Sequence, residues 1–154
     1  VGRIDGDGFD AILHERREEH ATAGGETSWH AYARLVLTEA QALGQALKVK
    51  PDDLEVLLQQ GILACRRAKW REAVEPLSRV VRLDPHAGHA YFYLGEALSR
   101  FDRWPEALAA YERATELEST NWRAWKGAGM VLDRLGRPAD AATFYRRARD
   151  VQRG

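Results

Sequence analysis

The sequence has little of several features that would place it in a special class. It contains one cysteine, Cys65, which excludes an internal disulfide. Its 23 Lys and Arg balance its 23 Asp and Glu, so no bulk positive charge exists to attract nucleic acid or an anionic membrane. Apolar stretches such as residues 31–37 are interrupted, here by Arg34, and fall far short of the roughly 20 residues that span a bilayer. Generic polyanion binders and transmembrane proteins are therefore disfavoured.

The composition is that of one globular domain. The 154 residues are 45% hydrophobic and 30% charged, and a chain of this length can bury roughly 70% of its unfolded surface without disulfides or metal. A lone cysteine is compatible with a reducing compartment, so we expect a cytoplasmic protein. Because the first residue is Val1 and not Met, we expect an excised domain or a processed product, and a removed signal peptide would leave no trace.

The strongest internal signal is a repeat with an offset of 34 residues. Four positions recur in register, and they are Gly61, Gly95 and Gly129; Ala73, Ala107 and Ala141; Leu77, Tyr111 and Tyr145; and Val80, Ala114 and Ala148. Each unit is predicted to form two helices, because its apolar residues are spaced three and four positions apart. A glycine costs about 1 kcal/mol in a helix interior, so its recurrence indicates a close helix crossing. We expect the three recurring alanines to be the surfaces that face the glycines.

Prolines recur where the pattern breaks. Pro51 and Pro85 each follow the end of a unit, whereas Pro105 and Pro138 suit the first turn of a second helix. The loops between helices are then about two to four residues long.

This pattern resembles the tetratricopeptide repeat family. The best copy of the family signature comprises Tyr91, Leu94, Gly95, Leu98, Ala107, Tyr111 and Ala114. The resemblance implies an all-α fold, a right-handed superhelical solenoid of antiparallel helix pairs with about eight helices and no sheet. Three repeat units are predicted at residues 54–87, 88–121 and 122–154. Residues 1–53 are predicted to form an irregular helical hairpin or a partial repeat.

The hairpin is predicted because the pattern frays upstream. The second-helix positions match at Leu43, Ala46, Leu47 and Pro51, but residues 23–26 place two glycines where the first helix should lie. We expect Thr27 or Ser28 to cap a helix that continues to about Val49. A short amphipathic helix around Phe9, Ile12 and Leu13 would precede it, and an irregular turn over residues 21–26 would join the two helices into a hairpin.

No catalytic or metal site is predicted. The acidic run at residues 5–10 has a calcium-loop spacing at first, but counting from Asp5 puts Arg16 where a ligating glutamate is needed. His86, His89 and Cys65 lack the further ligand that would complete a metal site. The sequence has no Gly-x-Ser-x-Gly and no phosphate-binding loop. We expect no enzyme activity and no cofactor.

The aromatic residues are mostly predicted to pack. Trp70 and Trp104 occupy the same repeat position, and so do Tyr91 and Trp125, which is typical of interior contacts. Trp29 and Trp122 have no such counterpart.

The resemblance also implies a binding surface, because the family's solenoids bind partners in a concave groove lined mainly by first helices. The implied face comprises Glu55, Leu58, Ile62, Cys65 and Arg66; His89, Phe92, Glu96, Ser99 and Arg100; and Arg123, Lys126, Met130, Asp133 and Arg134. All except Cys65, Ser99 and Asp133 are predicted partner-binding residues. Arg66, Arg100 and Arg134 form a ladder with one arginine in each unit. We expect an adaptor or scaffold that binds a protein or peptide carrying acidic and apolar residues, although a solvated basic face explains the same charges.

Three other functions have weaker support in the sequence. Binding of a chaperone C-terminal carboxylate is not supported, because Leu58, Ile62, Tyr93 and Gly127 stand where that family subtype has Lys, Asn, Asn and Arg, and only Arg123 matches. Self-assembly is the main alternative, through apolar residues such as Ala142 and Val151 on an uncapped last helix. The last unit has eight Lys and Arg against three Asp, but base-stacking motifs are missing and no nucleic acid partner is expected.

Overall fold

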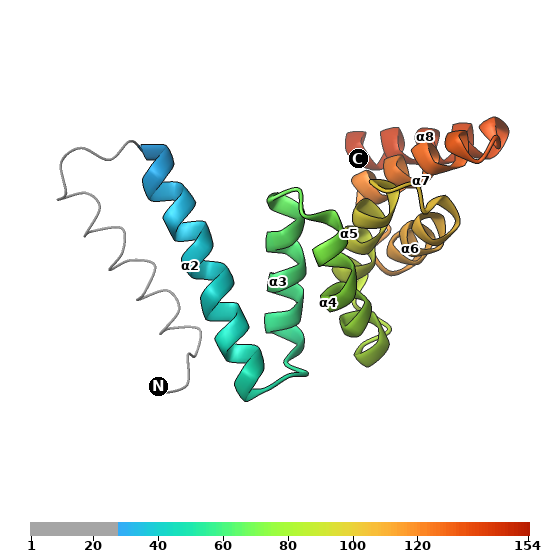
Figure 1. The fold of residues 1–154 in the computed structure, drawn as a ribbon. Helices are drawn as coiled ribbons and strands as arrows, with labels where there is room; N and C mark the ends of the chain where they lie inside the picture. The colour runs from blue at the N-terminus through green and yellow to red at the C-terminus, as the bar shows by residue number, and fades with distance from the viewer. Residues whose placement is uncertain (1–27) are drawn as a thin grey trace. The chain divides into compact units, whose positions relative to one another are not determined.

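The structure is a computed structural model that describes residues 28–154 (Figure 1). Within this range it contains seven helices and no strand, and the all-α prediction is confirmed. The helices are α2 (Ser28–Val49), α3 (Leu54–Arg66), α4 (Trp70–Leu83), α5 (Gly88–Ser99), α6 (Trp104–Leu117), α7 (Trp122–Arg134) and α8 (Pro138–Arg153). None of the helices in this range is long and apolar enough to cross a membrane.

The chain forms two compact units, residues 1–56 and residues 57–154. In the first unit, α2 has the bounds that the sequence predicted for the helix ending near Val49. The predicted short helix around Phe9 and the acidic run that begins at Asp5 lie outside the described residues. In the second unit, α4 packs against α5, α5 against α6, α6 against α7 and α7 against α8. Figure 1 shows this succession from green to red.

The helix ends follow local chemistry. Pro105 and Pro138 lie in the first turns of α6 and α8, as predicted. The missing N–H of proline costs nothing there, because the first turn has no intrahelical acceptor for it. Two helices have polar side-chain caps: Asp53 accepts a hydrogen bond from the Val56 N–H, and Asn121 accepts one from the Ala124 N–H, each at 3.2 Å. Loops of three or four residues join successive helices from α3 to α8, so neighbouring helices lie antiparallel.

The repeated glycines allow large side chains to approach the helix backbone. A Cβ at Gly61 would lie 2.5 Å from the Leu77 side chain, and one at Gly95 would lie 2.9 Å from the Tyr111 ring. Gly129 has the same relation to Tyr145, at 2.8 Å. The three atoms nearest each of these glycines belong to these side chains, and the expectation that Ala73, Ala107 and Ala141 face the glycines stays a prediction. These alanines are buried, but the residue one helical turn later has the long side chain that reaches the opposite backbone.

The turn after each first helix contains a left-handed residue. Ala68, Asp102 and Gly136 occupy equivalent positions 34 residues apart, with φ of 56°, 63° and 72°. Glycine adopts this conformation without steric cost, whereas alanine does not. The turn geometry is thus common to the three helix pairs, although only the third has the residue best suited to it.

Candidate functional site

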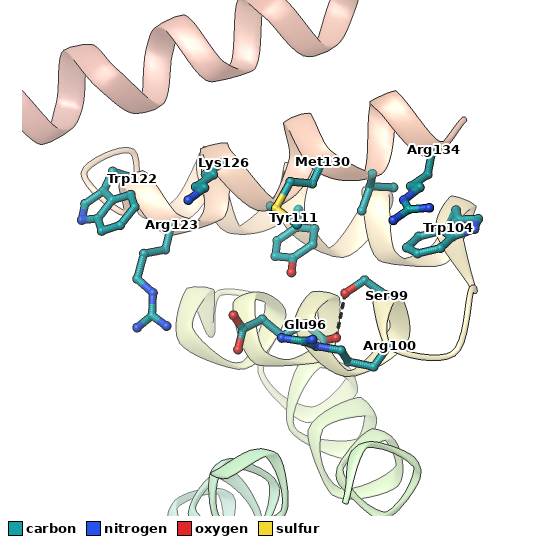
Figure 2. A pocket seen from close by; sticks show the side chains of 12 residues that line it. Glu96, Ser99, Arg100, Trp104, Tyr111, Trp122, Arg123, Lys126, Met130 and Arg134 are labelled. Carbon is teal, nitrogen blue, oxygen red and sulfur yellow. Dashed lines mark hydrogen bonds between the residues drawn. The ribbon is translucent and has the colours of Figure 1, made fainter. Parts of the chain in front are cut away.

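Residues of α5, α6 and α7, with Arg100 directly after α5, line a pocket of about 540 Å³. We call it the groove pocket, and it is lined by Glu96, Ser99, Arg100, Trp104, Tyr111, Trp122, Arg123, Lys126, Gly127, Met130, Val131 and Arg134. In Figure 2 Glu96 and Arg100 lie on one side, Lys126 and Met130 lie on the other, and the Tyr111 ring lies between them.

The pocket is strongly basic. Arg100, Arg123, Lys126 and Arg134 line it together with a single acid, Glu96. All four cationic residues are exposed. The Ser99 hydroxyl donates a hydrogen bond to the Glu96 backbone oxygen at 2.8 Å, within the last turn of α5. An occupant of this pocket meets an excess of positive charge, which favours anionic groups.

Aromatic and apolar side chains form the rest of the lining. The Tyr111 side chain is 4% exposed and is in close contact with both Gly95 of α5 and Gly127 of α7. Burial, with the nearby Glu96 carboxylate, raises the pKa of the Tyr111 hydroxyl above its ordinary value, so it remains protonated at neutral pH. Met130 is 55% exposed and offers an apolar contact at the rim. The pocket can therefore receive an apolar side chain next to an acidic one.

Three of the pocket arginines stack on aromatic rings. The guanidinium carbon lies 4.8 Å from the Trp70 ring centre for Arg100, 5.7 Å from that of Trp104 for Arg134, and 5.4 Å from that of Phe92 for Arg123. These distances are within the range of a favourable cation–π interaction.

The groove pocket includes six of the twelve predicted partner-binding residues: Glu96, Arg100, Arg123, Lys126, Met130 and Arg134. Ile62 and Phe92 are buried, at 7% and 4% exposure, so they contribute to packing between helices and not to the expected apolar strip. Leu58 is half-buried and Arg66 is exposed, outside this pocket. Glu55 belongs to the first unit.

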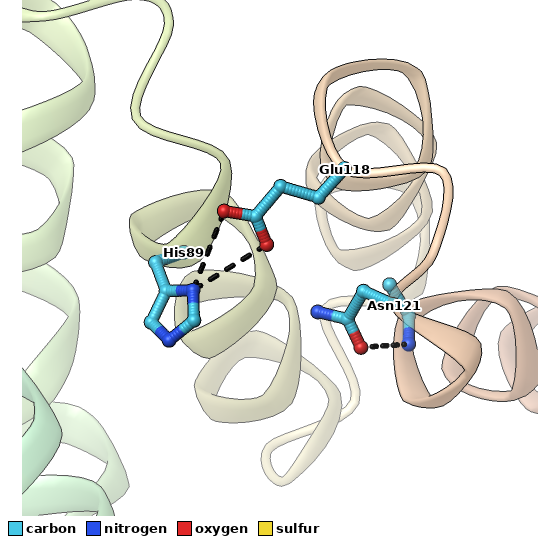
Figure 3. Close-up of polar contacts among 4 residues, drawn as sticks. His89, Glu118 and Asn121 are labelled. Carbon is cyan, nitrogen blue, oxygen red and sulfur yellow. Dashed lines mark hydrogen bonds and ion pairs between the residues drawn. The ribbon is translucent and has the colours of Figure 1, made fainter.

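His89 lies away from the groove pocket and has a partner of its own. Its Nδ1 lies 3.3 Å from one Glu118 carboxylate oxygen and 3.4 Å from the other (Figure 3). Asn121, which caps α7, is drawn beside this pair. The contact joins the start of α5 to the loop before α7, which gives His89 a structural explanation.

Asp133 also differs from the expectation that it shares the groove face. Its carboxylate accepts a hydrogen bond of 2.7 Å from the Tyr145 hydroxyl of α8. This interaction removes one acid from the predicted face and leaves the pocket more basic than the sequence indicated.

The sequence interpretation missed five lining residues: Trp104, Tyr111, Trp122, Gly127 and Val131. The recurrence of Trp104 with Trp70 predicts a packing role, yet both rings are only half-buried. The sequence does contain a signal for a role of these tryptophans in the pocket. An arginine follows each of them by 30 positions, Arg100 after Trp70 and Arg134 after Trp104. Gly127 has no counterpart in the other units, and that departure from the repeat also marked the site.

Cys65 has the environment of a structural thiol. It is 6% exposed, and its Sγ donates a weak hydrogen bond to the Tyr93 backbone oxygen at 3.9 Å. Burial and the Glu96 charge raise the pKa of the Cys65 thiol to about 11. Among residues 28–154 no group of three His, Cys, Asp or Glu side chains is arranged to hold a metal ion.

The last helix exposes mainly polar and small side chains. Ala142 is exposed and Val151 is half-buried. The exposed large hydrophobic residues in the described part of the chain are Val49, Leu54, Leu83 and Met130, none of which lies on α8.

Comparisons with known proteins agree with this architecture. The tetratricopeptide repeat family profile matches residues 58–117 and 97–153. A crystal structure of MamA protein is 24% identical, with a TM-score of 0.76 over 94% of this chain and 71% of that one. MamA 41-end from Desulfovibrio magneticus RS-1 is 15% identical, with a TM-score of 0.72 over 95% and 86%. At these low identities the structural likeness shows a shared fold alone. No curated protein sequence matches this chain.

Proposed function

We infer that this chain, which belongs to the tetratricopeptide repeat family, is a protein-interaction scaffold that binds a segment of a partner protein in the groove pocket. Repeats of stacked helix pairs provide extended surfaces for binding, and this pocket lies between successive first helices. We propose a binding role without catalysis of its own.

The partner segment we propose carries acidic side chains next to apolar ones. The observation that carries this proposal is the four-to-one excess of cationic over acidic residues around the pocket. Guanidinium groups bind carboxylates through two parallel hydrogen bonds, which gives orientation as well as affinity. Met130 and the rings of Trp104 and Trp122 supply the apolar contacts.

A blocked synthetic peptide of alternating glutamate and leucine, called here the Glu-Leu probe, tests this function. We expect calorimetry to show binding to the wild-type protein and none for a peptide with glutamine in place of glutamate. A variant combining Arg123→Glu and Lys126→Glu should lose binding, because both residues line the pocket. The matched control combines Arg146→Glu and Arg149→Glu, two exposed positions on α8. Equal affinity of the two variants for the probe would reject the groove pocket as the site.

Three other expectations stay predictions. Self-association through α8 finds no support in its exposed side chains, which include no large hydrophobic residue. A nucleic acid partner is not proposed, because the pocket favours a segment with both acidic and apolar groups. The cytoplasmic location is proposed from the single cysteine.

A further inference from the structure

Two sets of arginines in residues 57–154 have different kinds of partner. Arg103, Arg113 and Arg137 each make an ion pair with an acid three residues later, at 3.1, 2.9 and 2.9 Å. These pairs lie at or in the second helices, and their charges are largely neutralised locally. A partner's acidic group would have to compete with the resident carboxylate at each of these positions.

Arg100 and Arg134 have no such acid. Among the residues that the structure describes, neither forms an ion pair, and each guanidinium lies over a tryptophan ring, Trp70 or Trp104. The geometry repeats with the 34-residue period. The first residue of one unit's second helix stacks on the arginine at the end of the next unit's first helix, which is the residue directly after α5 for Arg100 and the last residue of α7 for Arg134. Both arginines are exposed, and Arg100 also borders a second depression beside Trp70 and Phe101.

Stacking on a ring and pairing with an acid differ in whether the N–H groups of the arginine stay available. A ring contacts the flat face of the guanidinium and restricts its motion, but it does not use the N–H groups on the edge. A carboxylate partner uses those N–H groups and cancels the charge. A stacked arginine is therefore both held in place and free to bind an anion, so less side-chain entropy is lost when the anion arrives.

The sequence limits this arrangement to two positions in the ladder. The residue 34 positions before Trp70 is Val36, and the one 34 positions after Trp104 is Pro138; neither has an aromatic ring. Arg66, the remaining member of the ladder, is exposed and has no ring partner in the described part of the chain. Two adjacent unit boundaries thus have a stacked arginine each.

We propose that Trp70 and Trp104 are positioning residues that hold Arg100 and Arg134 ready to bind two acidic side chains of one partner segment, at successive unit boundaries. This proposal rests on the acid-binding function proposed above and deepens it, because it states which arginines are preorganised and how many acids are bound together. It makes the indole rings determinants of specificity although they carry no charge.

The positioning itself is measured without any ligand. Nitrogen relaxation of the arginine Nε–H groups in the full chain should show Arg100 and Arg134 more ordered than Arg66. Trp104→Leu should lower the order of Arg134 and leave Arg100 unchanged, and Trp104→Phe should restore most of it because a ring remains. Three equally mobile arginines in the wild type, or an Arg134 that is insensitive to Trp104→Leu, would overturn the positioning role.

The consequence for binding is measured with the Glu-Leu probe. Trp70 does not line the groove pocket, so its ring acts there only through Arg100. Trp70→Leu should weaken the affinity for the probe about two- to fivefold, the range expected from a cation–π contact at an exposed site, and Trp70→Phe should recover it. The control is Trp125→Leu, which removes the ring under Arg147 outside the groove pocket and should leave the affinity unchanged at matched thermal stability. Equal weakening by the two leucine variants would reduce the effect to general destabilisation and overturn the proposal. Absence of wild-type binding to the probe would instead reject the acid-binding function, while the relaxation result still decides the positioning.

Discussion

At the scale of single residues, the three equivalent turns allow the cost of a left-handed backbone to be measured within one protein. Ala68 and Asp102 have φ of 56° and 63° where the third unit has Gly136. A left-handed alanine costs roughly 1–2 kcal/mol, and the entropy that glycine loses on folding offsets part of this. Ala68→Gly should therefore stabilise the protein by about 0.5–1 kcal/mol in urea unfolding.

Gly136→Ala is the matched reverse substitution. A Cβ there would contact nothing within 4 Å, so its effect is purely conformational, and we expect a loss of about 1 kcal/mol. Asp102→Gly should gain less than Ala68→Gly, because aspartate tolerates this conformation better than alanine. A loss of stability in Ala68→Gly would contradict this account of the turns.

A second prediction at this scale concerns alkaline stability. Partial burial and the hydrogen bond to Asp133 raise the pKa of Tyr145 to about 12 from its ordinary value near 10. The unfolded state thus loses this proton first, and the stabilisation is fully present below about pH 10 and lost as the pH rises toward 12. In Tyr145→Phe this contribution is missing, so the free energy of unfolding should fall less steeply over this interval. Parallel curves for the two proteins would contradict the shift.

At the scale of the helices, the close crossing of α5 and α6 depends on Gly95. A Cβ at this position would lie 2.9 Å from the Tyr111 ring, and that ring also contacts Gly127, so it has little room to move. Gly95→Leu should destabilise the protein by about 1–3 kcal/mol or more through overpacking. Gly44→Leu is the control, because a Cβ on that α2 glycine meets nothing within 4 Å and helix propensity alone favours leucine. Similar losses in chemical unfolding would contradict the packing assignment.

The same comparison shows what the sequence could predict at this scale. The 34-residue period and the prolines predicted the helix pairs, because both depend on local backbone chemistry. Which residue faces Gly95 could not be predicted, since it depends on the length of the Tyr111 side chain and the angle between two helices. The burial of Ile62 and Phe92 was missed for a related reason. Periodicity identifies one side of a helix, but the neighbouring helix decides how much of that side it covers.

At the scale of the whole molecule, the zero net charge conceals an uneven distribution. Residues 57–154 contain 17 Lys and Arg and 12 Asp and Glu, whereas residues 1–56 contain 6 and 11. Residues 57–154 are therefore cationic although the whole chain is neutral. A field of this kind increases the rate at which anionic partners associate and weakens with salt. Affinity, however, depends on which cationic residues the bound partner touches.

This distinction is tested by two arginines that share their local chemistry and differ in location. Arg100 stacks on Trp70 and lines the groove pocket, whereas Arg147 stacks on Trp125 and does not. Each substitution to glutamate reverses one exposed charge and breaks one cation–π contact, so the general effects on field and stability should match. We expect Arg100→Glu to weaken binding of the Glu-Leu probe by about 2–5 kcal/mol, the range for losing an oriented charge contact at an interface. Arg147→Glu should mainly slow association and reduce its dependence on salt. Calorimetry and stopped-flow kinetics separate the two effects, and equal affinity losses would show that the probe responds to total charge and not to the groove pocket.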